Sequence, residues 1–307
     1  MKATLLRQPK REWREREVFF VLISLKQWTC VILLNWYFFS ISSIKKLNGL
    51  INFLCRSIRK EKKRSKVSKR AAGQAIASVK NFVLATHVRP DGDALGSTFG
   101  LAHILKMMGK EVLCYLEQPV ADVYNFLTPH VPIETDFPSV AAFVEKCGVD
   151  IMGIALDCGD LGRLGEKGRE LNNIHPFLVI DHHQGNKGFG DLHWVEPHRS
   201  STGEMVYDLA EELGVADQLS REAAECLYTA IVTDTGSFRY DSTTEHTFAV
   251  AGKLIDRGVT PASVCQKLFD NASFGSLQLT QTVLATLQAP INQITSQWNF
   301  IRAQHIK

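Results

Sequence analysis

The chain has 307 residues, of which 45% are hydrophobic, 22% are charged and seven are cysteine. This composition excludes a disordered chain and permits one or two domains with a sizeable core. The cysteines are scattered and form no CxxC pair, which argues against a zinc knuckle or a secreted disulfide scaffold and favours a reducing cytoplasm.

The formal net charge of +3 is distributed unevenly along the chain. Residues 1–70 hold 18 of the 35 Lys and Arg residues but only 4 of the 32 acidic residues, so this segment carries +14 and the remainder −11. An acidic domain that lacks a basic groove binds long nucleic acid poorly. The charge balance therefore favours small substrates for the part of the chain that follows residue 70.

Residues 1–70 form a basic leader that contains one long apolar run. The run Val18–Ile44 has the length of a membrane span and carries Trp and Tyr, although Lys26 and Gln27 lie inside it. The basic block "RKEKKRSKVSKR" that follows would keep the rest of the chain cytoplasmic, tethered to the inner face of the membrane. The alternative is that residues 1–70 are translated upstream sequence outside the working protein, which would be cytoplasmic without a tether.

Residues 71–270 show the pattern of an α/β domain. Strands are expected at 81–86, 111–116, 151–156 and 177–180, and helical periodicity fills the intervals. Strands that alternate with helices predict a mostly parallel sheet with helices on both faces. Two further helix starts are expected, one from a capping box at Ser201 and Glu204 and one from Thr260 followed by Pro261.

Polar residues follow the predicted strands, at the sheet edge where parallel sheets bind ligands. They are His87, Asp91 and Asp93 in "THVRPDGDALGS", Asp157 after "IMGIAL", Asp181, His182 and His183 in "VIDHH", and Asp234, which closes an apolar helix ending in "IVTD". A single acidic residue after a strand is usually a helix cap or a turn former. Three successive strand ends of this kind, with a further Asp after an apolar helix, indicate one shared site instead.

The residue types in this cluster predict metal ions. Several carboxylates at one edge of a sheet repel one another unless a cation neutralises them. Carboxylates with one or two imidazoles and no thiolate suit Mn²⁺, or else Mg²⁺, Co²⁺ or Fe²⁺, better than structural Zn²⁺. Six or more ligands suit two ions about 3.5 to 4 Å apart that share one carboxylate. Such a pair activates a bridging water for in-line displacement at phosphorus.

Four motifs, "THVRPDGDALGS", "LDCGDLGRLG", "VIDHH" and "IVTDTGSF", resemble in order and spacing the motifs of the DHH phosphoesterases. This superfamily includes RecJ-like exonucleases, nanoRNases and manganese pyrophosphatases. The resemblance covers about residues 75–270. The most similar branch is the bifunctional oligoribonuclease and pAp phosphatase group, in which a DHHA1 domain follows the DHH domain.

The resemblance implies a ligand set for two manganese ions. One ion would be held by His87 and Asp91, the other by Asp93, His182 and Asp234, and Asp157 would bridge the two.

The resemblance also implies roles for residues that do not bind metal. His183 would face the substrate phosphate, and Asp181 would orient the adjacent imidazoles, since a carboxylate fixes the tautomer of a ligand histidine. Arg163 either grips a phosphate in a charge-assisted fork or is a solvated surface residue.

Other polar and glycine-rich stretches are expected to be structural. The glycines of "GDALGSTFG" would permit close packing of a helix on the sheet, since the stretch lacks the lysine of a phosphate-binding P-loop. The segment "SSTGE" is explained by its capping box. His103 in a helix, and His193 and His198 in a loop, are expected to be structural or exposed to solvent.

The chain departs from the family pattern after residue 270. Glycine does not occur after Gly275, so the glycine-rich substrate-binding motif of a DHHA1 domain is not found. Residues 271–307 are therefore expected to be a linker and a short helical remnant, the truncated start of such a domain.

The sequence thus predicts a Mn²⁺-dependent hydrolase of short oligoribonucleotides, linear dinucleotides or pAp, in which a metal-bridging hydroxide attacks phosphorus. One alternative is an inorganic pyrophosphatase or exopolyphosphatase that uses the same metal pair. Another alternative is a truncated remnant that binds metal or nucleotide without turnover. The expected partners are a short RNA or nucleotide substrate, a second copy in a homodimer and, if the leader is real, a membrane.

Overall fold

The structure is a computed structural model of the chain. It describes residues 3–6, 18–25, 28–35, 65–270 and 274–286. The chain divides into two compact units, Met1–Lys63 and Arg64–Lys307, and each is described by itself.

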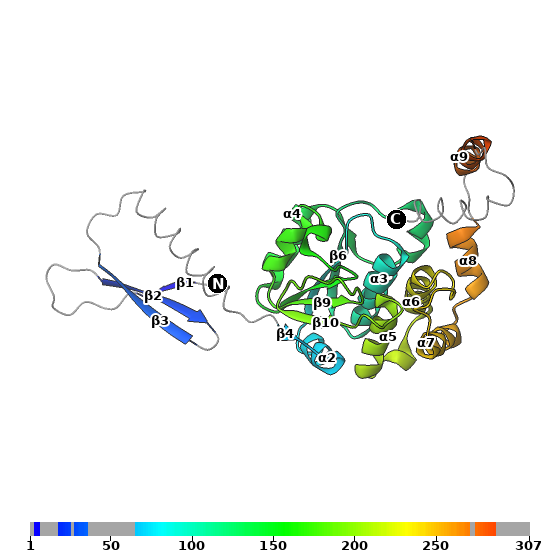
Figure 1. The fold of residues 1–307 in the computed structure, drawn as a ribbon. Helices are drawn as coiled ribbons and strands as arrows, with labels where there is room; N and C mark the ends of the chain where they lie inside the picture. The colour runs from blue at the N-terminus through cyan, green and yellow to red at the C-terminus, as the bar shows by residue number, and fades with distance from the viewer. Residues whose placement is uncertain (1–2, 7–17, 26–27, 36–64, 271–273, 287–307) are drawn as a thin grey trace. The chain divides into compact units, whose positions relative to one another are not determined.

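The described part of the first unit is a three-stranded antiparallel sheet in the order β1-β2-β3 (Figure 1). β1 (Ala3–Leu6) pairs with β2 (Val18–Leu25), and β2 pairs with β3 (Trp28–Asn35). The run Val18–Ile44, for which a membrane span and translated upstream sequence were the two alternatives, therefore contains two strands, and its residues 26–27 and 36–44 lie outside the described part. Its β-branched and aromatic residues favour strands. Among the residues that the structure describes, no helix is long and apolar enough to cross a membrane.

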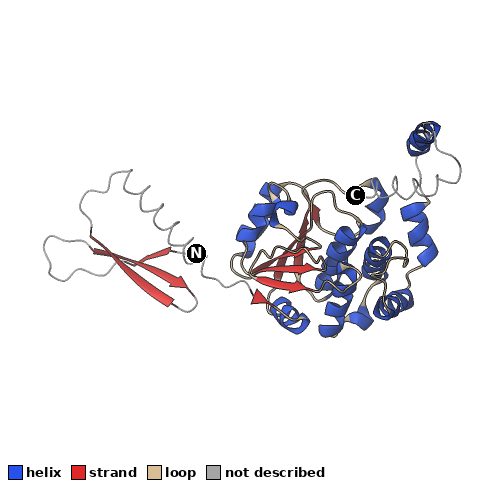
Figure 2. Ribbon diagram, viewed as in Figure 1, coloured by secondary structure: helices blue, strands red, loops and turns tan. Residues whose placement is uncertain are grey.

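The second unit is built on a seven-stranded sheet in the order β4-β10-β9-β8-β5-β6-β7. Figure 2 shows strands of this unit with helices around them. All neighbouring strands in the sheet are parallel. The strands are β4 (Ser65–Lys66), β5 (Asn81–Ala85), β6 (Glu111–Tyr115), β7 (Ile133–Glu134), β8 (Ile151–Leu156), β9 (Phe177–Asp181) and β10 (Leu192–Val195). The four strands expected from the sequence are β5, β6, β8 and β9, and the predicted α/β class is confirmed. The three additional strands are only two to four residues long.

Helices cover both faces of this sheet. Alternate residues of β5 enter different apolar clusters, with Phe82 and Leu84 on one face and Val83 and Ala85 on the other. The larger cluster includes side chains from α2 (Lys69–Ala77), α3 (Gly92–Met107), α5 (Thr202–Glu212), α6 (Arg221–Asp234), α7 (Glu245–Asp256) and α8 (Pro261–Phe269). The smaller cluster includes side chains from α4 (Phe137–Cys147) and from the 3₁₀ turns η2 (Leu161–Leu164) and η3 (Gly168–Asn173).

The glycine-rich stretch of α3 permits close packing against α6. The three glycines recur at four-residue intervals and are Gly92, Gly96 and Gly100. A Cβ atom on Gly96 would lie 2.4 Å from the carbonyl oxygen of Cys226 in α6. The close packing expected of these glycines is thus helix on helix and not helix on sheet. It fixes Asp234, at the end of α6, relative to Asp93, in the first turn of α3.

The predicted helix starts are confirmed, since α5 begins after the N-cap Ser201 and α8 begins at Pro261. His193, expected in a loop, is instead buried in the short strand β10. A further helix, α9 (Phe274–Ala285), follows α8 in the sequence, and residues 287–307 lie outside the described residues.

Candidate metal centre

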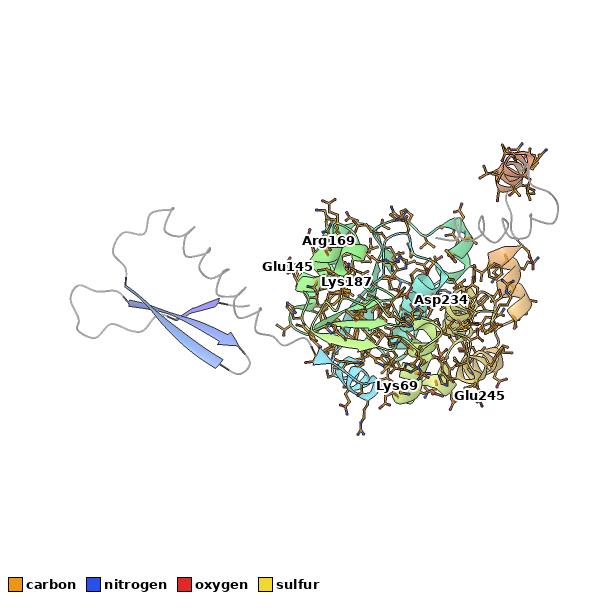
Figure 3. The ribbon with its side chains drawn as sticks, in the orientation of Figure 1. Lys69, Glu145, Arg169, Lys187, Asp234 and Glu245 are labelled. Atoms are coloured by element: carbon orange, nitrogen blue, oxygen red, sulfur yellow. The ribbon has the colours of Figure 1, made fainter. Side chains whose placement is uncertain are left out.

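The polar residues that follow β5, β8 and β9 lie at one edge of the sheet, because these three strands are neighbours and run parallel. β5 ends at Ala85, β8 ends at Leu156 and β9 ends at Asp181. Asp234, which is labelled in Figure 3, ends α6. Its Oδ2 atom lies 3.3 Å from Nε2 of His182, which follows β9. Four element ends therefore deliver the predicted site residues to one place.

His87, Asp91 and Asp157 form the first group of side chains that could hold a cation. His87 Nε2 lies 4.0 Å from Asp91 Oδ2 and 3.6 Å from Asp157 Oδ2. His87 Nδ1 donates to the carbonyl oxygen of Val88 at 2.9 Å, so in the neutral ring the lone pair of Nε2 faces the two carboxylates. Asp91 Oδ1 accepts from the N–H of Ala94 at 3.0 Å and thereby caps α3. One oxygen of Asp91 thus caps the helix, and the other faces His87.

Asp93, His182 and Asp234 form the second group. His182 Nε2 lies 3.7 Å from Asp93 Oδ2 and 3.3 Å from Asp234 Oδ2. The other ring nitrogen, Nδ1, donates to the carbonyl oxygen of Arg199 at 3.2 Å. This hydrogen bond selects the tautomer whose Nε2 lone pair is directed at the carboxylates, which is the form that binds a metal.

Asp157 lies between the two groups. Its Oδ2 atom faces His87, whereas its Oδ1 atom lies 3.6 Å from His182 Nε2 and 3.5 Å from His183 Nδ1. The side chain is buried, and the backbone φ of 53° is left-handed, which is uncommon for a residue other than glycine. Strain of this kind costs of order 1–3 kcal/mol and is concentrated at functional sites. The distances from Oδ2 to His87 and from Oδ1 to His182 show that the two oxygens of the Asp157 carboxylate face two different groups of side chains.

The carboxylates of this site carry more negative charge than their surroundings neutralise. Burial, together with the charges of Asp157 and Asp234, raises the pKa of Asp93 well above its usual range. Burial also raises the pKa of Asp234 to about 6, although His182 partly offsets the effect. At Asp157 burial acts in the same direction, but the nearby imidazoles of His87, His182 and His183 outweigh it and lower the pKa. Bound cations would let all three carboxylates ionise together, so the donor set fits divalent metal ions.

Asp181 holds the imidazole of His183. His183 Nδ1 donates to Asp181 Oδ1 at 2.7 Å, and this hydrogen bond raises the pKa of His183 to about 9. Asp181 is fully buried, and its Oδ2 accepts from Asn186 Nδ2 at 2.6 Å. His183 is 40% exposed and is therefore accessible to a substrate. Asp181 was expected to orient both imidazoles, but it contacts His183, whereas the Arg199 carbonyl orients His182.

Arg163 lies on η2, close to the first group. Its carbonyl oxygen accepts from the N–H of Val88 at 2.7 Å, next to His87. The side chain is exposed, and within residues 65–270 and 274–286 it forms no ion pair. A guanidinium in this position is able to pair with a phosphate.

The segment Arg199–Glu204 contributes contacts that the capping box did not predict. Ser201 caps α5 as expected, with its hydroxyl accepting from the N–H of Glu204 at 3.0 Å. The Glu204 carboxylate is used elsewhere, because it accepts from Arg199 at 3.0 Å, from Thr247 at 2.9 Å and also from Ser200. Glu204 therefore joins α5 to α7 and does not close the box.

The same segment contacts three of the predicted ligands, namely His182, Asp157 and Asp93. The sequence carried one signal for this role. Two serines precede α5 and a threonine begins it, whereas a helix cap needs only one hydroxyl.

Comparison with known proteins places this site in a wider context. Residues 81–231 match the family described as "DHH family, N-terminal domain". The chain is 38% identical over 186 residues to the bifunctional oligoribonuclease and PAP phosphatase NrnA of Thermus thermophilus, an alignment that covers 60% of this chain and 52% of that protein. It is 30% identical over 206 residues to the Bacillus subtilis protein of the same name, covering 64% of this chain and 59% of that protein. The chain thus spans a little over half the length of these relatives.

A solved structure shares the fold. The exopolyphosphatase-related protein from Bacteroides fragilis superposes with a TM-score of 0.66 and is 27% identical in sequence. The superposition covers 72% of this chain and 66% of that chain.

Proposed function

We propose that the chain, which belongs to the DHH family, is a phosphoesterase that uses two divalent cations to hydrolyse short nucleotides. The preferred ion is Mn²⁺, with Mg²⁺ and Co²⁺ as substitutes, because the donor set consists of carboxylates and imidazoles without thiolates. The observation that carries the proposal is the position of Asp157, whose two oxygens face different groups of ligands at 3.6 Å from His87 and from His182.

In this proposal His87 and Asp91 hold one cation, and Asp93, His182 and Asp234 hold the other. Asp157 is shared. The two cations would supply Lewis acidity at the phosphate and lower the pKa of a water molecule between them. The chain supplies the geometry, because the strand ends and the α3–α6 contact fix the six side chains before a cation arrives.

His183 and Arg163 act on the substrate. The water oxygen forms a bond to phosphorus, the bond from phosphorus to the leaving ester oxygen breaks, and that oxygen takes up a proton. Asp181 fixes Nδ1 of His183, so Nε2 is left for a phosphate oxygen or the leaving oxygen. Arg163, which is exposed beside His87, pairs with a phosphate of the same substrate.

The proposed substrates are short oligoribonucleotides, linear dinucleotides and pAp. Two relatives are named as oligoribonucleases and PAP phosphatases, at 38% and 30% identity. The acidic balance of the chain after residue 70 also favours small substrates over long nucleic acid.

A second candidate activity is hydrolysis of inorganic pyrophosphate or polyphosphate by the same metal pair. The fold shared with an exopolyphosphatase-related protein, at a TM-score of 0.66, favours this alternative. The two activities differ in whether the leaving group carries a nucleoside.

The test is turnover by the purified full chain with Mn²⁺, with pApA and pyrophosphate supplied in separate reactions. Asp157→Asn keeps the size of the side chain but removes its charge, and it should abolish turnover. Asp256→Asn, at an exposed position of α7, is the matched control and should leave turnover unchanged. Release of mononucleotide from pApA supports the nucleotide substrate, whereas cleavage of pyrophosphate alone supports the alternative. Turnover that survives in Asp157→Asn would contradict the proposed site.

A further inference from the structure

The first turn of α5 reaches two carboxylates proposed to bind the cations. The Thr202 hydroxyl donates to Asp157 Oδ1 at 3.1 Å, and the Thr202 N–H donates to Asp93 Oδ2 at 2.8 Å. The following N–H, of Gly203, donates to Asp93 Oδ1 at 2.8 Å. Consecutive groups of α5 therefore fix both oxygens of Asp93 and one oxygen of Asp157.

These contacts are shielded from water. Thr202 is 0% exposed, and Asp93 and Asp157 are 1% and 2% exposed. Hydrogen bonds in such surroundings face little competition from solvent and hold their acceptors in one orientation. Both carboxylates also lie at the N-terminal end of α5, where the helix dipole favours negative charge.

The position of Thr202 is set by helix packing and not by a loose loop. A Cβ atom on Gly203 would lie 2.3 Å from the Cβ of Ala230, so the first turn of α5 lies directly against α6. α6 ends at Asp234, a third carboxylate of the site. The packing that places Thr202 is therefore the packing that places Asp234.

The Thr202 hydroxyl restricts how the Asp157 carboxylate rotates. With Oδ1 held on the side of Thr202 and His182, the other oxygen is left on the side of His87. A carboxylate shared by two cations would be able to bind them in this arrangement, with one oxygen directed at each group of ligands. Groups that orient metal ligands in this way contribute about 10- to 100-fold to metal affinity.

We propose that Thr202 is a positioning residue, which aims Asp157 and Asp93 at the two cation positions before the cations bind. This inference rests on the proposed function and extends it from the ligands to the residue that orients them. In this proposal Thr202 acts through the Asp157 carboxylate, to which its hydroxyl donates, and not as a ligand.

The test compares hydroxyl-free and hydroxyl-bearing variants of the full chain by calorimetric titration of the metal-free protein with MnCl₂. Thr202→Val keeps the shape and removes the hydroxyl, and it should weaken Mn²⁺ binding by about 10- to 100-fold. Thr202→Ser restores the hydroxyl and should return the affinity to within a few-fold of wild type. Thr202→Ala is the second hydroxyl-free variant, for use if the valine side chain prevents folding.

Thr98→Val is the matched control. Thr98 is also fully buried, and its hydroxyl has no hydrogen-bond partner among the described residues. This variant should bind Mn²⁺ as wild type does.

Two results would overturn the inference. One is wild-type Mn²⁺ affinity in folded Thr202→Val or Thr202→Ala. The other is a loss of Mn²⁺ affinity in Thr202→Ser that equals the loss in Thr202→Val, because that result would mean that Thr202 acts through packing alone and not through its hydroxyl. If the wild-type chain itself takes up no Mn²⁺, the proposed function fails, and that result is distinct from a failure confined to Thr202.

Discussion

His182 donates from Nδ1 to the backbone carbonyl of Arg199 at 3.2 Å, so a main-chain oxygen orients a histidine at the centre of the site. The position of that carbonyl depends on the Arg199 side chain, which is anchored by three carboxylates. The guanidinium lies 3.0 Å from Glu196, 3.0 Å from Glu204 and 2.8 Å from Asp208. An ion-pair cluster behind the site is thereby connected to one of the proposed ligands.

Replacing Arg199 should therefore destabilise the fold. In Arg199→Met, the carboxylates of Glu204 and Asp208, each 1% exposed, lose the guanidinium group that pairs with them. Removal of one partner from a buried ion pair costs about 3–5 kcal/mol in the free energy of unfolding. Arg199→Lys keeps the charge but not the planar fork and should lie between Met and wild type.

Urea unfolding measures this effect. Arg169→Met, at an exposed position, is the control and should change the free energy of unfolding by no more than about 0.5 kcal/mol (Figure 3). An Arg199→Met protein as stable as the control would show that the cluster does not hold the segment.

Asp234 should make the metal-free protein less stable as pH rises. Its folded pKa of about 6 lies above the ordinary value of 3.8, so the folded state binds the proton more tightly than the unfolded state. The destabilisation is absent below about pH 4, grows up to about pH 6 and is constant above it. Asp234→Asn removes this titration and should gain about 1–2 kcal/mol over wild type between pH 4 and pH 7.5, after allowance for a side chain that is 34% exposed.

Unfolding of the chelator-treated proteins across this pH range tests the sign. Saturating Mn²⁺ at pH 7.5 should reverse the order, because only wild type carries the full ligand set. Parallel stability curves for the two proteins would contradict the raised pKa of Asp234.

His183 should affect turnover and not metal binding. His183→Asn removes the imidazole proposed to act on the phosphate and should lower kcat by about 10²- to 10⁴-fold. Asp181→Asn should act in the same direction, because it weakens the hydrogen bond that holds His183. Since His183 also lies among side chains that could hold a cation with Asp157 and His182, Mn²⁺ affinity must be measured in parallel. Loss of Mn²⁺ binding in His183→Asn would make this residue a metal ligand instead.

Gly96 should tolerate no side chain. The Cβ atom of Gly96→Ala would lie 2.4 Å from the Cys226 carbonyl, so α6 must shift, at a cost of about 1–3 kcal/mol. Because α6 carries Asp234, Mn²⁺ affinity should fall as well. Gly252→Ala, in open space on α7, is the control and should be stabilising by about 0.5–1 kcal/mol. Equal stability of the two variants would contradict the close α3–α6 contact.

The sequence predicted the central part of the fold and the residues that gather at its edge. The strands β5, β6, β8 and β9 have five or six residues each and are mostly apolar and buried, so their pattern is clear in the sequence. Because parallel neighbours end at the same edge, the residues after β5, β8 and β9 had to approach one another. The metal roles assigned to these residues remain predictions.

The features that the sequence did not predict depend on tertiary contacts. β4, β7 and β10 are too short for a periodic signal, and the burial of His193 in β10 follows from the strands beside it. The capping pattern at Ser201 explained the segment locally, so the contacts from Thr202 to Asp93 and Asp157, more than forty residues away in sequence, went unpredicted. In the first unit, an apolar run of membrane length forms paired strands in its described part. Apolar β-branched residues suit both a β-strand and an apolar membrane span, so the sequence did not distinguish the two.

Electron paramagnetic resonance of the full chain titrated with Mn²⁺ tests the central claim most directly, since it counts the ions and detects magnetic coupling between them. The account predicts two bound ions with the spectrum of a coupled pair in wild type, and loss of that coupling in Asp157→Asn, where the shared carboxylate is gone. A single uncoupled ion in wild type, or a coupled pair that persists in Asp157→Asn, would contradict it.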